Sequence, residues 1–158
     1  MKELLENLLK LTEDEFEDIF QPYSKEEFIQ KRLANMNLTK NDDGTYSTDG
    51  NVDLRNLGLE KLPVKFKFVG GQFNCHGNNL TTLEGCPEKV GKIFYCSYCK
   101  LTTLEGAPKE VGGDFFCGGN KLTTLEGAPE KVGGGFYCSW NYLSSYKLKQ
   151  TIKRDYLN

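Results

Sequence analysis

The chain lacks a long apolar run and a strong charge of either sign. No apolar stretch in its 158 residues approaches the roughly 20 that a membrane-spanning helix needs. Its 20 basic and 22 acidic residues give a formal charge of -2, which argues against a nucleic-acid binder or a polybasic membrane protein. The start, MKELLENLLKL, lacks the apolar core and cleavage site of a signal peptide. We therefore expect a cytoplasmic protein whose six cysteines stay reduced.

The sequence also has little of what catalysis requires. His76 is the only histidine, and there is neither a Ser-His-Asp set nor a cluster of carboxylates. We therefore predict a protein that is not an enzyme and that uses no cofactor. The alternative is a thiol-dependent enzyme, for which Cys99, beside Tyr98, is the only candidate nucleophile.

Cysteines are present in a pattern that is typical of a core and not of a metal site. Cys96-x-x-Cys99 is one isolated pair, whereas a zinc site usually needs four converging ligands. Free cysteine behaves as a small apolar side chain and is among the most buried residue types. The prediction is buried structural thiols and no bound metal.

A 21-residue repeat dominates the rest of the sequence. The stretches VGGQFNC, VGKIFYC, VGGDFFC and VGGGFYC follow one another at that period, at 69–75, 90–96, 111–117 and 132–138. LTTLEG recurs with the same period, at 80–85, 101–106 and 122–127. A diverged earlier copy places Val52 under Phe73 and Leu54 under Cys75. A fixed period of this length predicts a solenoid, here of about five turns.

Within each turn, the columns read apolar-x-apolar-x-x-(Asn or Cys)-x-Leu. The first two columns are Phe and Cys, two apart, so both side chains of a strand point inward. The third column holds Asn78, Cys99, Asn120 and Asn141, and its amides are expected to satisfy backbone groups in the bend after the strand. The glycine and proline of LTTLEGAP supply a tight return.

This order resembles the leucine-rich repeat, with Gly70, Gly91, Gly112 or Gly133 where its first Leu would stand. The trailing LTTLEGAP resembles short repeats of bacterial effector proteins, and also LTSLEGAP-type repeat proteins of bacteria and phages that have no assigned role. The resemblance implies an α+β solenoid with a parallel β-sheet over about residues 50–143. It further implies a protein partner, such as a host protein serving defence, met in the host cytoplasm if the chain is phage-encoded.

We expect caps at both ends of the repeats. Residues 1–36 are predicted to form a helical N-terminal cap, with capping boxes at Thr12/Glu15 and Ser24/Glu27. A hairpin or linker follows at 37–50, the solenoid at 51–143, and a short basic capping helix at 144–158. An alternative role for the N-terminal cap, which has nine acidic and five basic residues, is to bind a basic partner.

The outward strand positions vary from turn to turn, and there the sequence collects large rings. They are predicted to line the concave sheet face and to bind a protein partner through Asp53, Asn74, His76, Tyr95, Tyr98, Phe116, Tyr137 and Trp140. A ring stack that merely stiffens the sheet is the alternative. Three further alternatives are a module similar to secreted effectors, a structural or self-associating module, and ice binding by the paired threonines of LTTLEG.

Overall fold

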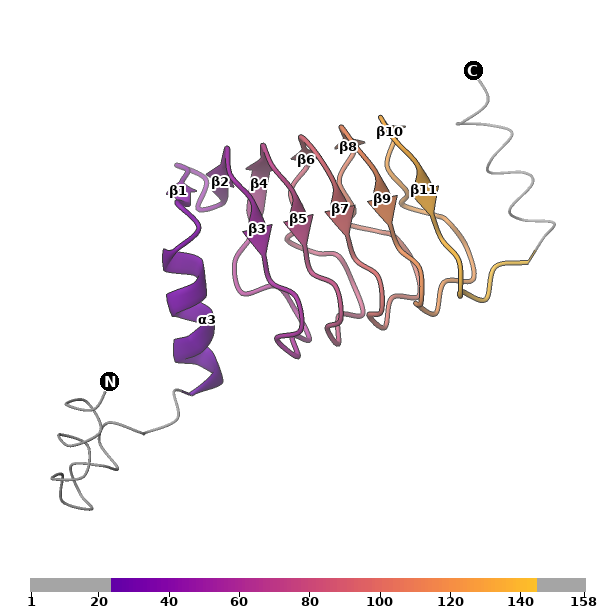
Figure 1. Cartoon of the computed structure of the whole chain (residues 1–158), viewed down its shortest axis with the longest axis horizontal. Coiled ribbons are helices and arrows are strands. Elements are labelled where there is room, and N and C mark those ends of the chain that lie inside the picture. The colour runs from indigo at the N-terminus through magenta and orange to yellow at the C-terminus, as the bar shows by residue number, and fades with distance from the viewer. Residues whose placement is uncertain (1–23, 145–158) are drawn as a thin grey trace, which may run out of the picture. The chain divides into compact units, whose positions relative to one another are not determined.

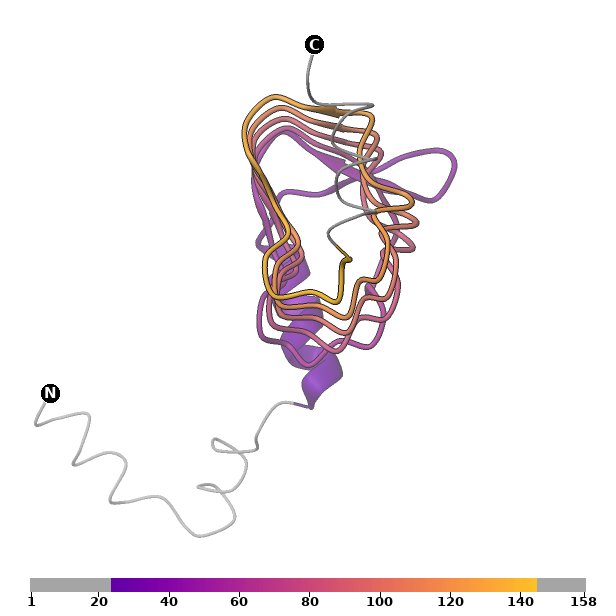
Figure 2. The same ribbon diagram turned by 90° about the vertical axis from the view of Figure 1, so that its right-hand side faces the viewer.

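The computed structural model describes residues 24–144, and the chain divides into two compact units, residues 1–32 and 33–158. The second unit is a β-solenoid built from short strands in two sheets (Figure 1). Viewed along the stack, successive turns superpose closely (Figure 2). The solenoid predicted from the 21-residue period is therefore confirmed.

Each full turn contributes one strand to each sheet. The six-stranded sheet, here sheet A, runs β1 (Thr39–Lys40), β2 (Tyr46–Thr48), β4 (Phe66–Val69), β6 (Lys89–Val90), β8 (Glu110–Val111) and β10 (Lys131–Val132). The five-stranded sheet, here sheet B, contains β3 (Val52–Asp53), β5 (Phe73–Asn74), β7 (Phe94–Tyr95), β9 (Phe115–Phe116) and β11 (Phe136–Tyr137). All pairs are parallel except β1 with β2.

The second sheet corrects the expectation of a single parallel β-sheet. Val69 and Phe73, four residues apart, lie in different sheets, in β4 and β5. Gly70 and Gly71, which follow Val69 directly, form a corner between the two sheets. Consecutive turns approach so closely there that a Cβ on Gly112 would overlap the carbonyl oxygen of Gly91. Glycine at this column is required by that backbone approach, and it ends the strand where the leucine-rich pattern would continue.

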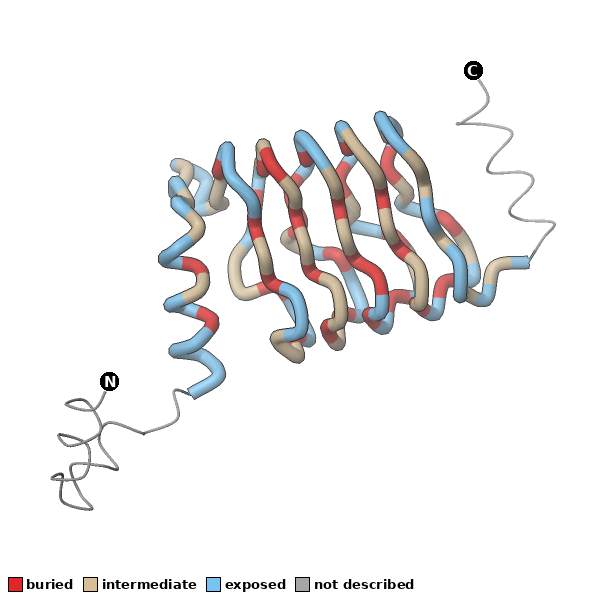
Figure 3. The backbone as a smooth tube through the Cα atoms, viewed as in Figure 1, coloured by how far each residue is buried: buried red, intermediate tan, exposed pale blue. Residues whose placement is uncertain are grey.

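The core consists of the two columns that the sequence predicts to point inward. Phe73, Phe94 and Phe115 are fully buried, and adjacent rings stack at centroid distances of 5.4 and 5.3 Å. Cys75, Cys96 and Cys117 are fully buried beside them. Buried and less buried residues alternate along sheet B (Figure 3). The diverged first turn also has the predicted register, since Val52 pairs with Phe73.

The asparagine column joins successive turns. The amide oxygen of Asn78 accepts from the backbone N–H of Leu57 (3.1 Å) and Leu59 (3.0 Å), and its nitrogen donates to the carbonyls of Leu54 and Cys75 (both 2.8 Å). Asn120, two turns further on, repeats this set of hydrogen bonds. The predicted role of the column is confirmed: each amide satisfies four backbone groups of two turns, which otherwise lie buried without partners.

Cys99 occupies the same column and substitutes for the amide in part. Its thiol donates to the Cys75 carbonyl at 3.4 Å, as the Asn120 amide donates to the Cys96 carbonyl at 2.9 Å. Cys99 is thus a structural member of the column, as its sequence position predicts.

The residues before the solenoid form a helix and a hairpin. Helix α3 (Lys25–Ala34) begins after Ser24, whose Oγ accepts from the Glu27 N–H (3.2 Å) while the Glu27 carboxylate accepts from the Ser24 N–H (2.9 Å). This is the predicted capping box. β1 and β2 pair antiparallel around Gly44, which has φ 80°. The predicted Thr12/Glu15 box lies outside the described residues, and so does the C-terminal helix predicted at 144–158, except for its first residue, Ser144.

We expect Gly112→Ala to lower the free energy of unfolding by about 2–3 kcal/mol, because the added methyl group forces two turns apart. Gly50→Ala is the matched control, since its Cβ would meet its nearest neighbour, Thr48 Oγ1, at 3.4 Å. Urea unfolding of both variants checks the prediction. Equal losses of stability in the two variants would contradict a corner closed by backbone contact.

Candidate binding surface

The outward positions of sheet B carry a ladder of stacked rings. Tyr95 and Phe116 stack at 4.9 Å and Phe116 and Tyr137 at 4.5 Å, with the ring planes 8° apart in both pairs. Tyr95 and Phe116 are half-buried and Tyr137 is 49% exposed, while the cysteines beside them point into the core. The rings therefore lie on the outer face of sheet B, where the alternation of the strands places them.

Two further rings follow the strands in an uncommon backbone conformation. Tyr98 and Trp140 have φ values of 54° and 60°, in the left-handed region, and their side chains are 62% and 84% exposed. Bulky L-residues rarely adopt this conformation, and each such residue costs about 1–2 kcal/mol. The same column holds Asn56, Gly77 and Gly119, all with positive φ, so the solenoid imposes this backbone geometry at every turn.

Large residues and glycine alternate along this column because the side chains lean onto the next turn. A Cβ at Gly119 would lie 2.8 Å from the ring of Tyr98, and a Cβ at Gly77 would overlap the side-chain oxygen of Asn56. Gly119 therefore makes room for Tyr98. Here the aromatic face denotes Tyr95, Tyr98, Phe116, Tyr137 and Trp140.

The remaining predicted site residues lie toward the other end of the stack. The Asp53 carboxylate forms an ion pair with Arg55 (3.1 Å), and the Asn74 side chain accepts from the His76 N–H (3.0 Å). The His76 ring lies 5.4 Å from that of Tyr98, so the structure brings these two predicted residues together. Asp53 and Asn74 instead stabilise the turns that follow their own strands, where each side chain accepts from the backbone N–H two residues later.

Tyr142, which is 71% exposed, was missed by the sequence reasoning. Its column holds Asn79, Lys100 and Lys121, and a variable column of this kind was a signal that it faces solvent. It adds a further exposed ring two residues after Trp140.

The two sheets present different chemistry to solvent. Outward residues of sheet A alternate in the sign of their charge. Lys89 pairs with Glu110 at 2.9 Å, and this contact lowers the pKa of the Glu110 carboxyl. The outward positions of β7, β9 and β11 carry no charge. Charged residues flank them instead: Lys92, Lys100 and Lys121 are exposed, whereas the Asp114 carboxylate accepts from the Gly135 N–H at 2.7 Å.

The thiols are placed as structural residues. Cys75, Cys86, Cys96, Cys99 and Cys117 are buried and Cys138 is partly exposed. A hydrogen bond with Cys75, together with burial, raises the pKa of the Cys99 thiol far above its ordinary value. Burial also raises the pKa of Cys96, Cys117 and Cys138. Thiols that remain protonated are poor nucleophiles.

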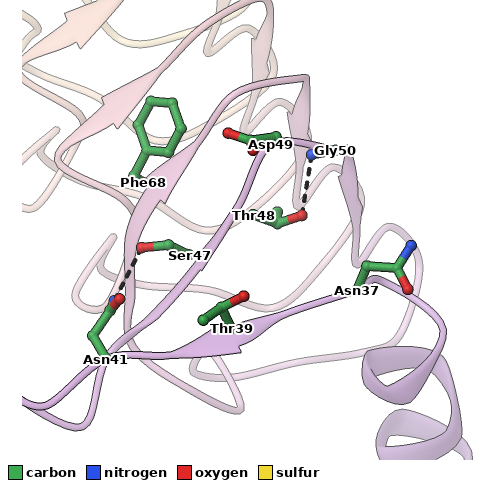
Figure 4. A pocket seen from close by; sticks show the side chains of 8 residues that line it. All are labelled: Asn37, Thr39, Asn41, Ser47, Thr48, Asp49, Gly50 and Phe68. Carbon is green, nitrogen blue, oxygen red and sulfur yellow. Dashed lines mark hydrogen bonds between the residues drawn. The ribbon is translucent and has the colours of Figure 1, made fainter.

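A pocket of about 380 Å³ lies beside the hairpin (Figure 4). Its polar atoms stabilise the hairpin itself. Asn41 donates to the hydroxyls of Thr45 and Ser47 (both 2.9 Å), and the Thr48 hydroxyl donates to the Met36 carbonyl (3.3 Å). Across residues 24–144, no group of three or more His, Cys, Asp or Glu side chains is arranged to hold a metal ion.

In the same range, no helix has the length and apolar character needed to cross a membrane.

Comparisons with protein families, with curated proteins and with solved structures found no match to this chain.

We expect Tyr98→Gly to be more stable than Tyr98→Ala by about 1 kcal/mol, because both lose the ring but only glycine relieves the left-handed backbone. The same pair at Tyr95, in strand β7, is the control, and there alanine should be the more stable. Thermal and urea unfolding measure both differences. The same ranking at the two sites would contradict backbone strain at Tyr98.

Thiol labelling of the native protein near pH 8 should modify Cys138 first, because it is the one partly exposed thiol among the six. The other five should react only as the protein unfolds, and Cys138→Ser should remove the early phase. Mass spectrometry of the labelled protein identifies the site. Rapid, stoichiometric labelling of Cys99 would instead support the thiol-dependent enzyme.

Proposed function

We propose that this protein is a non-enzymatic binding module that holds a protein partner through the aromatic face. The observation that carries the proposal is the pair Tyr98 and Trp140, which are largely exposed and held in left-handed backbone. Such backbone persists only where the surrounding structure imposes it, and it is concentrated at functional sites. Nothing in the packing of the core requires a large ring at either position, since Gly77 and Gly119 occupy the same column.

The composition of the surface supports a protein partner. Tyrosine and tryptophan supply large rigid contacts, and Ser139, Gly118 and Gly119 lie among them. The same residue types make up antibody combining sites and interface hot spots. If the five rings each bury about 100 Å², the gross gain is about 12 kcal/mol, against an association cost of about 4–15 kcal/mol. The face is large enough to anchor a complex that also has contacts at its rim.

A stack that only stiffens the sheet is the competing explanation. The contacts among Tyr95, Phe116 and Tyr137 are consistent with it. It leaves Tyr98 and Trp140 unexplained, because neither stacks in that ladder and both carry the strained backbone. For this reason the binding function rests on these two residues.

We also propose that the repeat is a divergent leucine-rich repeat of the bacterial and phage type, acting in the cytoplasm on a host protein such as a component of defence. The asparagine column and the apolar pattern over sheet B favour this relation, whereas the separate sheet A departs from it. Caps at both ends of the solenoid belong to the same proposal.

The function is tested by affinity capture from the native host, with partners identified by mass spectrometry. We expect the double variant Tyr98→Gly/Trp140→Gly to capture at least tenfold less partner. It should melt at the same or a higher temperature, because both glycines suit the left-handed backbone. Phe28→Ser removes another exposed ring, on α3, and is the matched control that should retain capture.

Capture that survives in the double variant would refute the proposal. Light scattering of the purified protein separates it from a structural or self-associating module, which predicts concentration-dependent assembly without any partner.

A further inference from the structure

We propose that the aromatic face binds an acidic, proline-rich segment in the polyproline II conformation, lying along the stack across Tyr98 and Trp140. This inference rests on the proposed function and names the chemistry of the partner. It follows from the spacing of the two rings, their character, and the charges around them.

The spacing of the rings selects the conformation of the ligand. Tyr98 and Trp140 occupy the same column two turns apart, and parallel strands lie about 4.8 Å apart, so equivalent atoms recur at about 9.6 Å. The stacked rings of sheet B, at 4.9 and 4.5 Å, have the spacing of one turn. A polyproline II helix rises about 3.1 Å per residue with three residues per turn, so its residues i and i+3 present one face at about 9.3 Å.

Other backbone conformations match this spacing less well. In a β-strand, residues i and i+2 are only about 6.6 Å apart, and residue i+3, at about 10 Å, faces the opposite side. In an α-helix the same face returns at i+7, after about 10.5 Å. Polyproline II is the conformation that brings equivalent side chains to both rings.

The chemistry of the surface suits proline. Tyrosine and tryptophan offer apolar rings that end in a hydrogen-bond donor, and a polyproline II segment offers apolar rings and carbonyls that have no internal partner. Gly119 occupies the column between Tyr98 and Trp140, so that no third side chain of the column separates the two rings.

Charge complementarity selects an acidic segment. Lys100 and Lys121 each follow the left-handed column by two residues, and both are exposed. Lys92 precedes β7 and is also exposed, whereas the nearby Asp114 carboxylate is engaged by the Gly135 N–H. The three lysines outnumber this carboxylate, so the charge near the uncharged rings is net positive.

Single-stranded nucleic acid, the other acidic ligand that aromatic surfaces take, is disfavoured. Bases bind by stacking on open ring faces. The rings of Tyr95, Phe116 and Tyr137 are stacked on one another, and the ring of Tyr98 lies between His76 and Gly119. Of the five rings, that of Trp140, which is 84% exposed, is the one left to stack on a base, whereas surfaces that bind single strands stack successive bases on several rings.

The test uses the fluorescence of Trp140, which is the only tryptophan in the chain and lies in the proposed site. Full-length protein is titrated with a peptide of four Glu-Pro-Pro repeats, acetylated and amidated. We expect a saturable change in emission. Four Glu-Gly-Gly repeats have the charge without the conformation, and four Lys-Pro-Pro repeats have the conformation without the charge, so both should bind at least tenfold more weakly.

Variants assign the binding to the named residues. Tyr98→Gly keeps the reporter and should weaken the Glu-Pro-Pro peptide at least tenfold, as should Lys100→Glu/Lys121→Glu. Lys40→Glu/Lys61→Glu makes the same charge change at exposed lysines outside the aromatic face and should leave binding unchanged.

Three results would overturn the inference: equal binding of the Glu-Gly-Gly peptide, tighter binding of a twelve-nucleotide oligothymidine, or no change in emission up to about 1 mM Glu-Pro-Pro peptide. Each leaves the protein-binding function itself to be decided by the capture experiment. If the Tyr98→Gly/Trp140→Gly variant loses capture and the Glu-Pro-Pro peptide does not bind the protein, the face binds a partner of different chemistry.

Discussion

Hydrogen bonds between turns, at a register of 21 residues from Ser47 onward, hold this solenoid together. Most strands are two residues long, so no strand is stable by itself, and each turn is completed by its neighbours. The Phe73 N–H donates to the Ile93 carbonyl at 2.9 Å, and the Gly91 N–H donates to the Val69 carbonyl at 2.8 Å. Because the register repeats, a residue in a strand lies beside the residue 21 positions away, and the residue types in each column follow from what packs well between neighbouring turns.

Each kind of side chain meets this constraint differently. Phenylalanines stack face to face, and the amides of Asn78 and Asn120 donate to backbone carbonyls of the preceding turn. Lysine on lysine would repel, so the outward column of sheet A alternates Lys89, Glu110 and Lys131. On sheet B the outward column is uncharged and aromatic in its last three turns. The repeated register thus explains why the outward residues of sheet A alternate in charge and why the outer face of sheet B is uncharged and available for binding.

The sequence alone predicts the interior well and the backbone poorly. The burial of the phenylalanine and cysteine columns, the asparagine bonds and the first diverged turn all follow from the 21-residue period. Sheet A was not predicted because most of its strands, such as Lys89–Val90, have only two residues and are too short to show alternation. The rings of the candidate site were found as variable positions. The left-handed backbone of Tyr98 and Trp140 was not predicted, although the residues of the same column, Asn56, Gly77 and Gly119, are types that favour it.

The alternation of that column also limits how such an array grows. A side chain as large as that of Tyr98 covers the backbone of the turn that follows, so two consecutive turns cannot both carry one. Duplication of a single repeat would bring two bulky residues together or leave two glycines adjacent. Gain or loss of repeats in multiples of 42 residues preserves the alternation, whereas a single turn inserted next to one with a bulky residue has to carry a glycine in this column.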